Sequence, residues 1–156
     1  MNPDRLKNIG LGILFLLVQV ALFRHLKILK IQPDLVLIFL LWYAARYDRT
    51  SAIVMAAGFS FLQDALLDLW GLNMFTKTLL IFVSFNFIPR NTKKQLLIGQ
   101  VFLTVLIGAL VHNIIFLGLN SVIVNYTAEI FFWRHLIGNS CYTALVAAII
   151  YLFRTR

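Results

Sequence analysis

Long runs of apolar residues, separated by short polar segments, make up most of the chain. The runs show little alternation with a period of two, so they predict helices and argue against a membrane β-barrel. We expect helices at residues 9–23, 33–46, 51–68, 73–88, 96–119 and 134–153. Several of these runs are shorter than the roughly 20 residues that cross a bilayer comfortably. Snorkelling Lys and Arg side chains or local thinning of the bilayer would make up the difference.

The composition indicates that these helices belong to a membrane protein. Of the 156 residues, 61% are hydrophobic, and the mean hydropathy is +0.87, well above the values of soluble domains. The sequence therefore predicts an all-α integral membrane protein, folded as one compact bundle of six transmembrane helices over residues 1–156. A cleaved signal peptide is not expected, because Arg24, His25 and Lys27 follow the first apolar run in place of small residues. The single cysteine, Cys141, excludes an intrachain disulfide.

The net charge of +8 comes from basic residues that lie in small groups between the apolar runs. They form no single basic stripe, so we interpret them as topology determinants and contacts to anionic lipid headgroups, with no role in nucleic-acid binding. Six spans place nine Lys and Arg on the side of the termini: Arg5, Lys7, Arg46, Arg49, Arg90, Lys93, Lys94, Arg154 and Arg156. Four lie on the other side: Arg24, Lys27, Lys30 and Arg134. This bias predicts that both termini are cytoplasmic. The cytoplasmic basic groups could also meet a cytoplasmic protein.

The stretch Gly58–Thr78 is the most informative, because it places ionisable groups where the composition predicts hydrocarbon. Asp64 continues a row of small residues that recurs every four positions, so it is expected to face another helix and not lipid. The row consists of Ala52, Ala56, Ser60, Asp64 and Asp68. A similar row on the last helix, Ser140, Ala144 and Ala148, makes that helix the expected neighbour.

Asp64 admits two interpretations. Two carboxylates one helical turn apart, Asp64 and Asp68, repel each other unless a cation or proton lies between them. Alternatively, Asp64 pairs with Lys77, since the two residues lie at equal distances from the turn that joins their helices, roughly 7–8 Å below it. We favour the ion pair with Lys77, which would fasten the third and fourth helices together. Asp68 receives no role on this interpretation.

Other polar residues raise chemical possibilities that their spacing does not favour. His112 and His135 could bind a metal with Asp64, but they lack the spacing of a metal-binding motif. Ser140 lacks the sequence of a nucleophile elbow, and no phosphate loop or HExxH motif occurs. We therefore predict no catalytic, cofactor or metal site, and a protein that is not an enzyme. Together with Asn113 and Asn139, the His residues and Ser140 are expected to gather in the external half of the bundle.

Three segments carry a resemblance to a known family: QPDLVLIFLLWYAARY at 32–47, GFSFLQD at 58–64 and GLNMFTKTL at 71–79. In the order and spacing of PDL, AxRY, FLQD and GLNxxxKT, the chain resembles the MreD family of bacterial rod-shape-determining membrane proteins. The resemblance implies structural and interface roles for six residues: Asp34, Arg46, Gln63, Asp64, Asn73 and Lys77.

The resemblance also implies a function and a fold. The expected function is a non-enzymatic scaffold in the bacterial inner membrane that binds the single-span protein MreC. Through MreC it would connect MreB filaments with the peptidoglycan synthases of elongation, RodA and a penicillin-binding transpeptidase. The expected fold is similar to that of the substrate-binding subunits of energy-coupling-factor vitamin transporters. That likeness leaves open an alternative, a membrane subunit that binds a vitamin-type molecule near Asp64, Lys77, His112 and Asn139.

Overall fold

The computed structural model describes residues 3–23, 31–89, 96–124 and 129–155. Within these residues the regular elements are all helical. They are α1 (Pro3–Val18), the π-helix η1 (Gln19–Phe23), α2 (Leu35–Ala44), α3 (Arg49–Leu67), α4 (Leu72–Ser84), α5 (Ile98–Val124) and α6 (Glu129–Thr155). The predicted all-helical class and the six helices are confirmed. Three of the helices, α3, α5 and α6, are long and apolar enough to cross a membrane.

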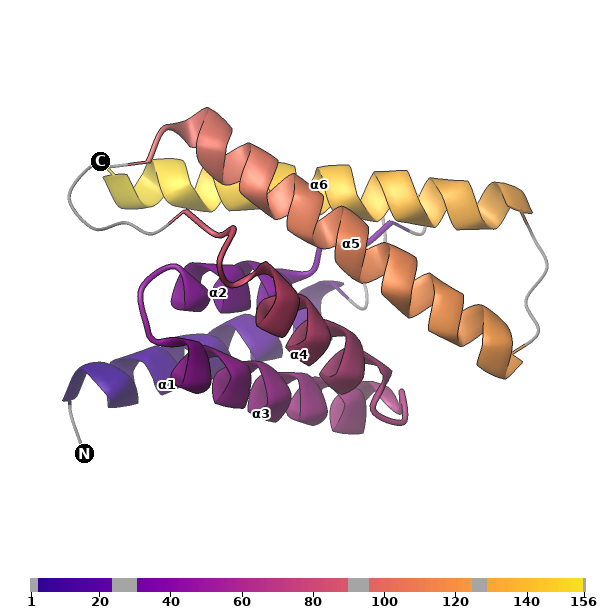
Figure 1. Cartoon of the computed structure of the whole chain (residues 1–156), viewed down its shortest axis with the longest axis horizontal. Helices are drawn as coiled ribbons and strands as arrows, with labels where there is room; N and C mark the ends of the chain where they lie inside the picture. The colour runs from indigo at the N-terminus through magenta and orange to yellow at the C-terminus, as the bar shows by residue number, and fades with distance from the viewer. Residues whose placement is uncertain (1–2, 24–30, 90–95, 125–128, 156) are drawn as a thin grey trace.

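The short helix α2 lies at the centre of the fold (Figure 1). Nine of its ten residues are buried, and α1, α3, α4, α5 and α6 all contact it. A helix that is apolar on every side is stable only when it is covered on every side. At its middle, the Phe39 ring packs edge-on against Phe59 of α3, with 5.3 Å between ring centroids, and lies 6.1 Å from Phe15 of α1. These rings join the N-terminal helices to α2.

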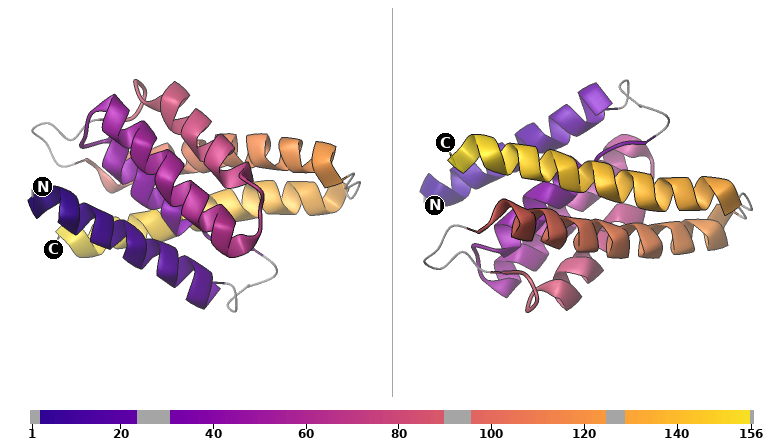
Figure 2. Two further views of the ribbon diagram at one scale, coloured as in Figure 1. Left: turned by 90° about the horizontal axis from the view of Figure 1, so that it is seen from below. Right: turned by 90° about the horizontal axis from the view of Figure 1, so that it is seen from above.

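The remaining helices surround α2 as two groups (Figure 1). Helices α3 and α4 form the predicted hairpin, which packs beside α1, whereas α5 and α6 form a long pair on the opposite side of α2. The N-terminal end of α1 and the C-terminal end of α6 lie at the same end of the bundle (Figure 2). Of the residues used in the charge count, several lie outside the described residues: Arg24, Lys27, Lys30, Arg90, Lys93, Lys94 and Arg156. His25 lies outside them too.

The expected packing of the third helix against the last is wrong. Ala52, Ala56, Ser60 and Asp64 do face the interior, and each is at most 3% exposed. However, α3 packs against α1, α2 and α4, while α6 packs against α5 and α2. The central helix α2 therefore occupies the space in which these two rows of small residues were expected to meet.

Several boundaries differ from the predicted runs. Helix α2 covers only Leu35–Ala44 of the predicted 33–46, because Asp34 is its N-cap and accepts a hydrogen bond from the Leu37 amide. Helix α4 ends at Ser84, short of the predicted 88, and a turn follows in which the amides of Phe87 and Ile88 both donate to the Ser84 carbonyl. Pro89 has no amide hydrogen with which to continue the helix. Conversely, α5 and α6 each extend to 27 residues.

The turn between α3 and α4 gives Asp68 a structural position. Asp68 is the C-cap of α3, with a left-handed backbone (φ 57°), and its amide donates to the Asp64 carbonyl. Its side chain is exposed, whereas Asp64 is buried. The alternative of a cation shared by these two carboxylates finds no support here. No group of three potential metal ligands occurs among the described residues, including the proposed set of Asp64, His112 and His135.

Asp68→Gly should stabilise the protein by up to about 1 kcal/mol, because glycine adopts a left-handed conformation without the strain of a Cβ atom. Unfolding of the purified protein in mild detergent measures the effect. Gly71→Ala is the matched control, with φ 85° and open space around the position of the added Cβ. It should destabilise the fold by about 1 kcal/mol through the backbone alone. A loss of stability in Asp68→Gly would contradict the assignment of Asp68 as a cap.

Candidate functional site

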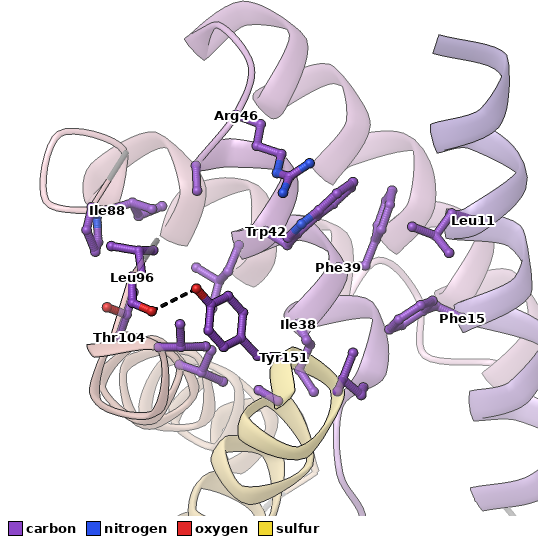
Figure 3. A pocket seen from close by; sticks show the side chains of 17 residues that line it. Leu11, Phe15, Ile38, Phe39, Trp42, Arg46, Ile88, Leu96, Thr104 and Tyr151 are labelled. Carbon is purple, nitrogen blue, oxygen red and sulfur yellow. Dashed lines mark hydrogen bonds between the residues drawn. The ribbon is translucent and has the colours of Figure 1, made fainter. Parts of the chain in front are cut away.

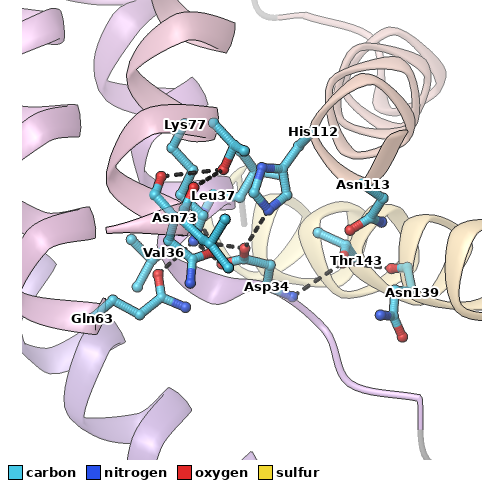
Figure 4. Close-up of polar contacts among 12 residues, drawn as sticks. Asp34, Val36, Leu37, Gln63, Asn73, Lys77, His112, Asn113, Asn139 and Thr143 are labelled. Atoms are coloured by element: carbon cyan, nitrogen blue, oxygen red, sulfur yellow. Dashed lines mark hydrogen bonds and ion pairs between the residues drawn. The ribbon is translucent and has the colours of Figure 1, made fainter. Parts of the chain in front are cut away.

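Lys77 on α4 is a charged residue with no exposed surface. Its ammonium Nζ lies 2.6 Å and 2.9 Å from the two carboxylate oxygens of Asp34, and it donates to Oε1 of Gln63 at 2.5 Å (Figure 4). An unpaired ammonium in such a position would cost several kcal/mol. Three charged or polar oxygens therefore compensate for its loss of water.

Asp34 accepts Lys77 at the N-terminus of the central helix. Its carboxylate also accepts the Leu37 amide at 2.9 Å, and Nε2 of His112 on α5 lies 3.6 Å from Oδ2. Its own amide donates to the Thr143 hydroxyl of α6 at 3.1 Å. The carboxylate thus faces both the positive end of the α2 dipole and the Lys77 ammonium, and each favours its charged form.

Two further amides complete the start of α2. Gln19, the first residue of η1, accepts the Val36 amide with its Oε1 at 2.9 Å. Asn139 of α6 accepts the Gln32 amide at 3.0 Å. We call the set formed by Gln19, Asp34, Gln63, Lys77, His112, Asn139 and Thr143 the polar hub. Every helix contributes to it, with Gln19 continuing α1 and Asp34 opening α2.

The predicted ion pair between Asp64 and Lys77 is wrong. The Asp64 carboxylate instead accepts three hydrogen bonds at the start of α4: from the amide of Asn73 at 3.1 Å, its Nδ2 at 2.9 Å, and the amide of Met74 at 2.8 Å. Gly71, the N-cap of α4, has no side chain that could do this. Asp64 therefore caps α4 from α3, and Lys77 reaches Gln63, one residue earlier on α3. Equal distance from the turn therefore did not determine the partner of Lys77.

The structure brings together five of the six residues that the family resemblance singled out: Asp34, Gln63, Asp64, Asn73 and Lys77. Arg46 lies apart, at the C-terminal end of α2, with its guanidinium 4.7 Å from the centre of the Trp42 ring. Sequence reasoning missed Gln32 and Thr143, and gave Gln19 no partner. A glutamine inside an apolar run was the available signal for Gln19, since buried amides need partners.

A polar cavity of about 160 Å³ adjoins the hub. His112 and Asn139 line it as expected, together with Asp34, Gln63, Asn73 and Asn113, while Lys77 and Asp64 are not part of its lining. Nδ1 of His112 is buried and has no hydrogen-bond partner among the described residues. The cavity therefore offers a carboxylate, amides and an imidazole to a small polar molecule.

Ser140 takes part in packing between α5 and α6. Its hydroxyl donates to the Leu136 carbonyl at 2.6 Å and accepts from Nδ2 of Asn113 at 2.9 Å. Nδ1 of His135 lies 3.2 Å from Nδ2 of Asn139. Both partners of the Ser140 hydroxyl are therefore groups of the packed helices, a carbonyl of α6 and a side-chain amide of α5.

Lys77→Met and Asp34→Asn should each destabilise the fold by about 3 kcal/mol, because each leaves one buried charge without its partner. Asparagine keeps the N-cap oxygen for Leu37, so the second variant isolates the charge. The double variant should be more stable than the sum of the two losses predicts, with a coupling of about 2 kcal/mol in detergent unfolding experiments.

Asp64→Asn is the matched control for this cycle. It weakens the cap of α4, but its coupling to Lys77→Met should be below about 1 kcal/mol, since the two side chains share no hydrogen bond. A larger coupling for Asp64 than for Asp34 would restore the original ion-pair prediction.

Comparisons with known proteins identify no relative of this chain. No family model matches the chain, and no curated protein or solved structure matches it significantly. The likeness to the MreD family therefore rests on the three sequence segments quoted above.

Proposed function

We propose that this chain is an MreD-like scaffold of the bacterial inner membrane, which binds a single-span MreC-like protein and helps to maintain rod shape. One observation carries the proposal: five of the motif residues, drawn from all three quoted segments, lie in two neighbouring hydrogen-bonded groups at one end of α2. The second and third segments were expected to meet across their short turn, but the spacing gave no reason for Asp34 of the first segment, 43 positions before Lys77, to join them. Their convergence supports treating them as one structural signature.

The surface of the bundle supports placing it in a membrane with six spans. Large apolar side chains are exposed on every helix except α2. Examples are Leu14 of α1, Phe61 of α3, Phe82 of α4, Ile107 of α5 and Ile149 of α6, all more than half exposed. Water disfavours such a surface, whereas lipid and membrane helices match it.

The contrast between paired charges in the interior and apolar side chains on the surface supports a scaffold. Lys77, Asp34 and Asp64 satisfy one another or nearby backbone groups, so these three buried charges hold the fold and are not free for chemistry. What remains available to a partner is the apolar outer surface. A single membrane-spanning helix, such as that of an MreC-like protein, matches this surface through close packing. The elongation proteins MreB, RodA and the transpeptidase would then join through that partner.

The polar cavity favours a second candidate, a subunit that binds a small molecule. His112 presents an unpartnered Nδ1 at a cavity of about 160 Å³ that also contains the Asp34 carboxylate and several amides. These groups fit a small, uncharged molecule with hydrogen-bond donors and acceptors. This candidate shares the membrane fold with the scaffold and differs from it only in the use of the cavity.

Reporter fusions test the proposed topology. A cytoplasmic fluorescent protein should be active when joined to either terminus or inserted after Asp48, between α2 and α3. An alkaline phosphatase reporter should be active only when it is inserted after Leu69, between α3 and α4. Phosphatase activity at either terminus would contradict the orientation with both ends in the cytoplasm.

Site-specific photo-crosslinking in a rod-shaped host tests the scaffold. A crosslinker is placed in turn at Leu14, Phe61, Phe82, Ile107 and Ile149. Only those positions that lie on neighbouring helices of the bundle should capture a single-span partner. Depletion of the protein should round the cells. Leu40, which is 1% exposed, is the matched position that should capture nothing. Normal rods after depletion would exclude the scaffold.

His112→Phe separates the two candidates. Phenylalanine fills the same space beside Phe116, 5.8 Å away between ring centres, but has no nitrogen to bind a ligand. A scaffold should keep partner capture and rod shape in this variant, whereas a small-molecule subunit should lose its ligand and its cellular role.

A further inference from the structure

The second cavity of the fold differs from the polar one in both position and chemistry. It has a volume of about 130 Å³, is open to the outside, and lies toward the C-terminal end of α2 (Figure 3). Leu11 and Phe15 of α1 border one side, and Ile150 and Tyr151 of α6 border another. An apolar cavity of this size excludes water and accepts hydrocarbon.

The two hydroxyl groups in this lining are already hydrogen-bonded. The Tyr151 hydroxyl donates to the Leu96 carbonyl at 2.7 Å, and the Thr104 hydroxyl donates to the Gln100 carbonyl at 2.8 Å. Arg46 also lines the cavity, and it is exposed and makes no ion pair within the described part of the chain. Its guanidinium is held over the Trp42 ring. Among the described residues that line it, the cavity thus combines an apolar interior with one cation, Arg46.

We propose that this cavity binds one acyl chain of an anionic phospholipid, whose phosphate pairs with Arg46. The combination of a hydrocarbon-sized space and a single unpaired guanidinium matches an amphiphile with one negative charge at its polar end. The surrounding bilayer supplies such molecules in large excess, and anionic lipids are concentrated in the cytoplasmic leaflet.

The depth of Arg46 agrees with this occupant. The C-terminal end of α2 lies at the end of the bundle where the chain termini lie (Figure 1), and Arg46 comes directly after the C-cap residue Ala45. In the proposed topology that end is cytoplasmic, so the guanidinium lies at headgroup level while Phe39 and Ile38 line the cavity deeper in the membrane. The inference rests on the membrane placement proposed above and is independent of the scaffold's protein partner.

Trp42 lies in the cavity lining and provides a reporter for the test. Of the three tryptophans, Trp70→Phe and Trp133→Phe remove the other two. The resulting full-length protein is reconstituted in phosphatidylcholine vesicles that contain a small, equal fraction of brominated phosphatidylglycerol or brominated phosphatidylcholine. Bromine quenches tryptophan fluorescence on contact. The lipid affinity derived from quenching should be roughly fivefold higher for the anionic lipid, which is the preference conferred by one arginine at a charged headgroup.

Two variants separate the site from a general basic surface. Arg46→Gln should abolish the preference, whereas Arg49→Gln should keep it, because the Arg49 guanidinium lies over Phe82, outside the cavity lining. Ala147→Leu, which narrows the cavity from α6, should reduce quenching by both lipids.

Equal quenching by the two lipids, or loss of the preference in both arginine variants, would overturn the proposal. Absence of quenching by either lipid would also overturn it and would indicate that a protein segment covers the cavity. Flotation of the same vesicles reports membrane insertion separately, and the assay contains no partner protein. Failure of the lipid site therefore stays distinguishable from failure of the scaffold.

Discussion

The buried ion pair between Lys77 and Asp34 is the constraint on which the rest of the fold depends. Helix α2 is apolar on every side, so hydrophobic burial alone would tolerate its rotation or a shift along its axis. An ammonium with no exposed surface cannot tolerate such a shift, because it would lose the carboxylate that compensates it. The polar hub therefore fixes the position of α2, and α2 in turn positions the helices around it.

The helices themselves were predictable from the sequence, because apolar runs and turn residues determine them locally. The interior position of Asp64 followed from the spacing of small residues, and the α3–α4 hairpin followed from the short turn between two apolar runs. The gathering of His112 and Asn139 near one end also followed from their positions along their helices. These features depend on distances of a few turns, over which helical geometry is regular.

The partner of Lys77 was not predictable in this way. Asp34 lies 43 positions away in sequence, and helical spacing relates residues only within one helix or across a short turn. The short apolar stretch between Asp34 and Arg46 was the available signal, because ten helical residues span only about 15 Å. A helix of that length at the centre of a bundle must begin well inside it. Its N-cap is then buried, and a buried carboxylate requires a cation.

The deep start of α2 explains the residues that precede it. Residues 31–34 are not helical, and non-helical backbone at membrane depth persists only when each polar group has a partner. The Gln32 amide donates to Asn139, and the Asp34 amide donates to Thr143. Pro33 lies between them and has no amide hydrogen to satisfy. Pro33, which begins the predicted helix, therefore lets the extended segment approach α6 with only two hydrogen-bond acceptors, the Asn139 amide oxygen and the Thr143 hydroxyl. The two side chains on α6 stand four positions apart, one helical turn, which matches the two-residue spacing of the donors along the extended chain.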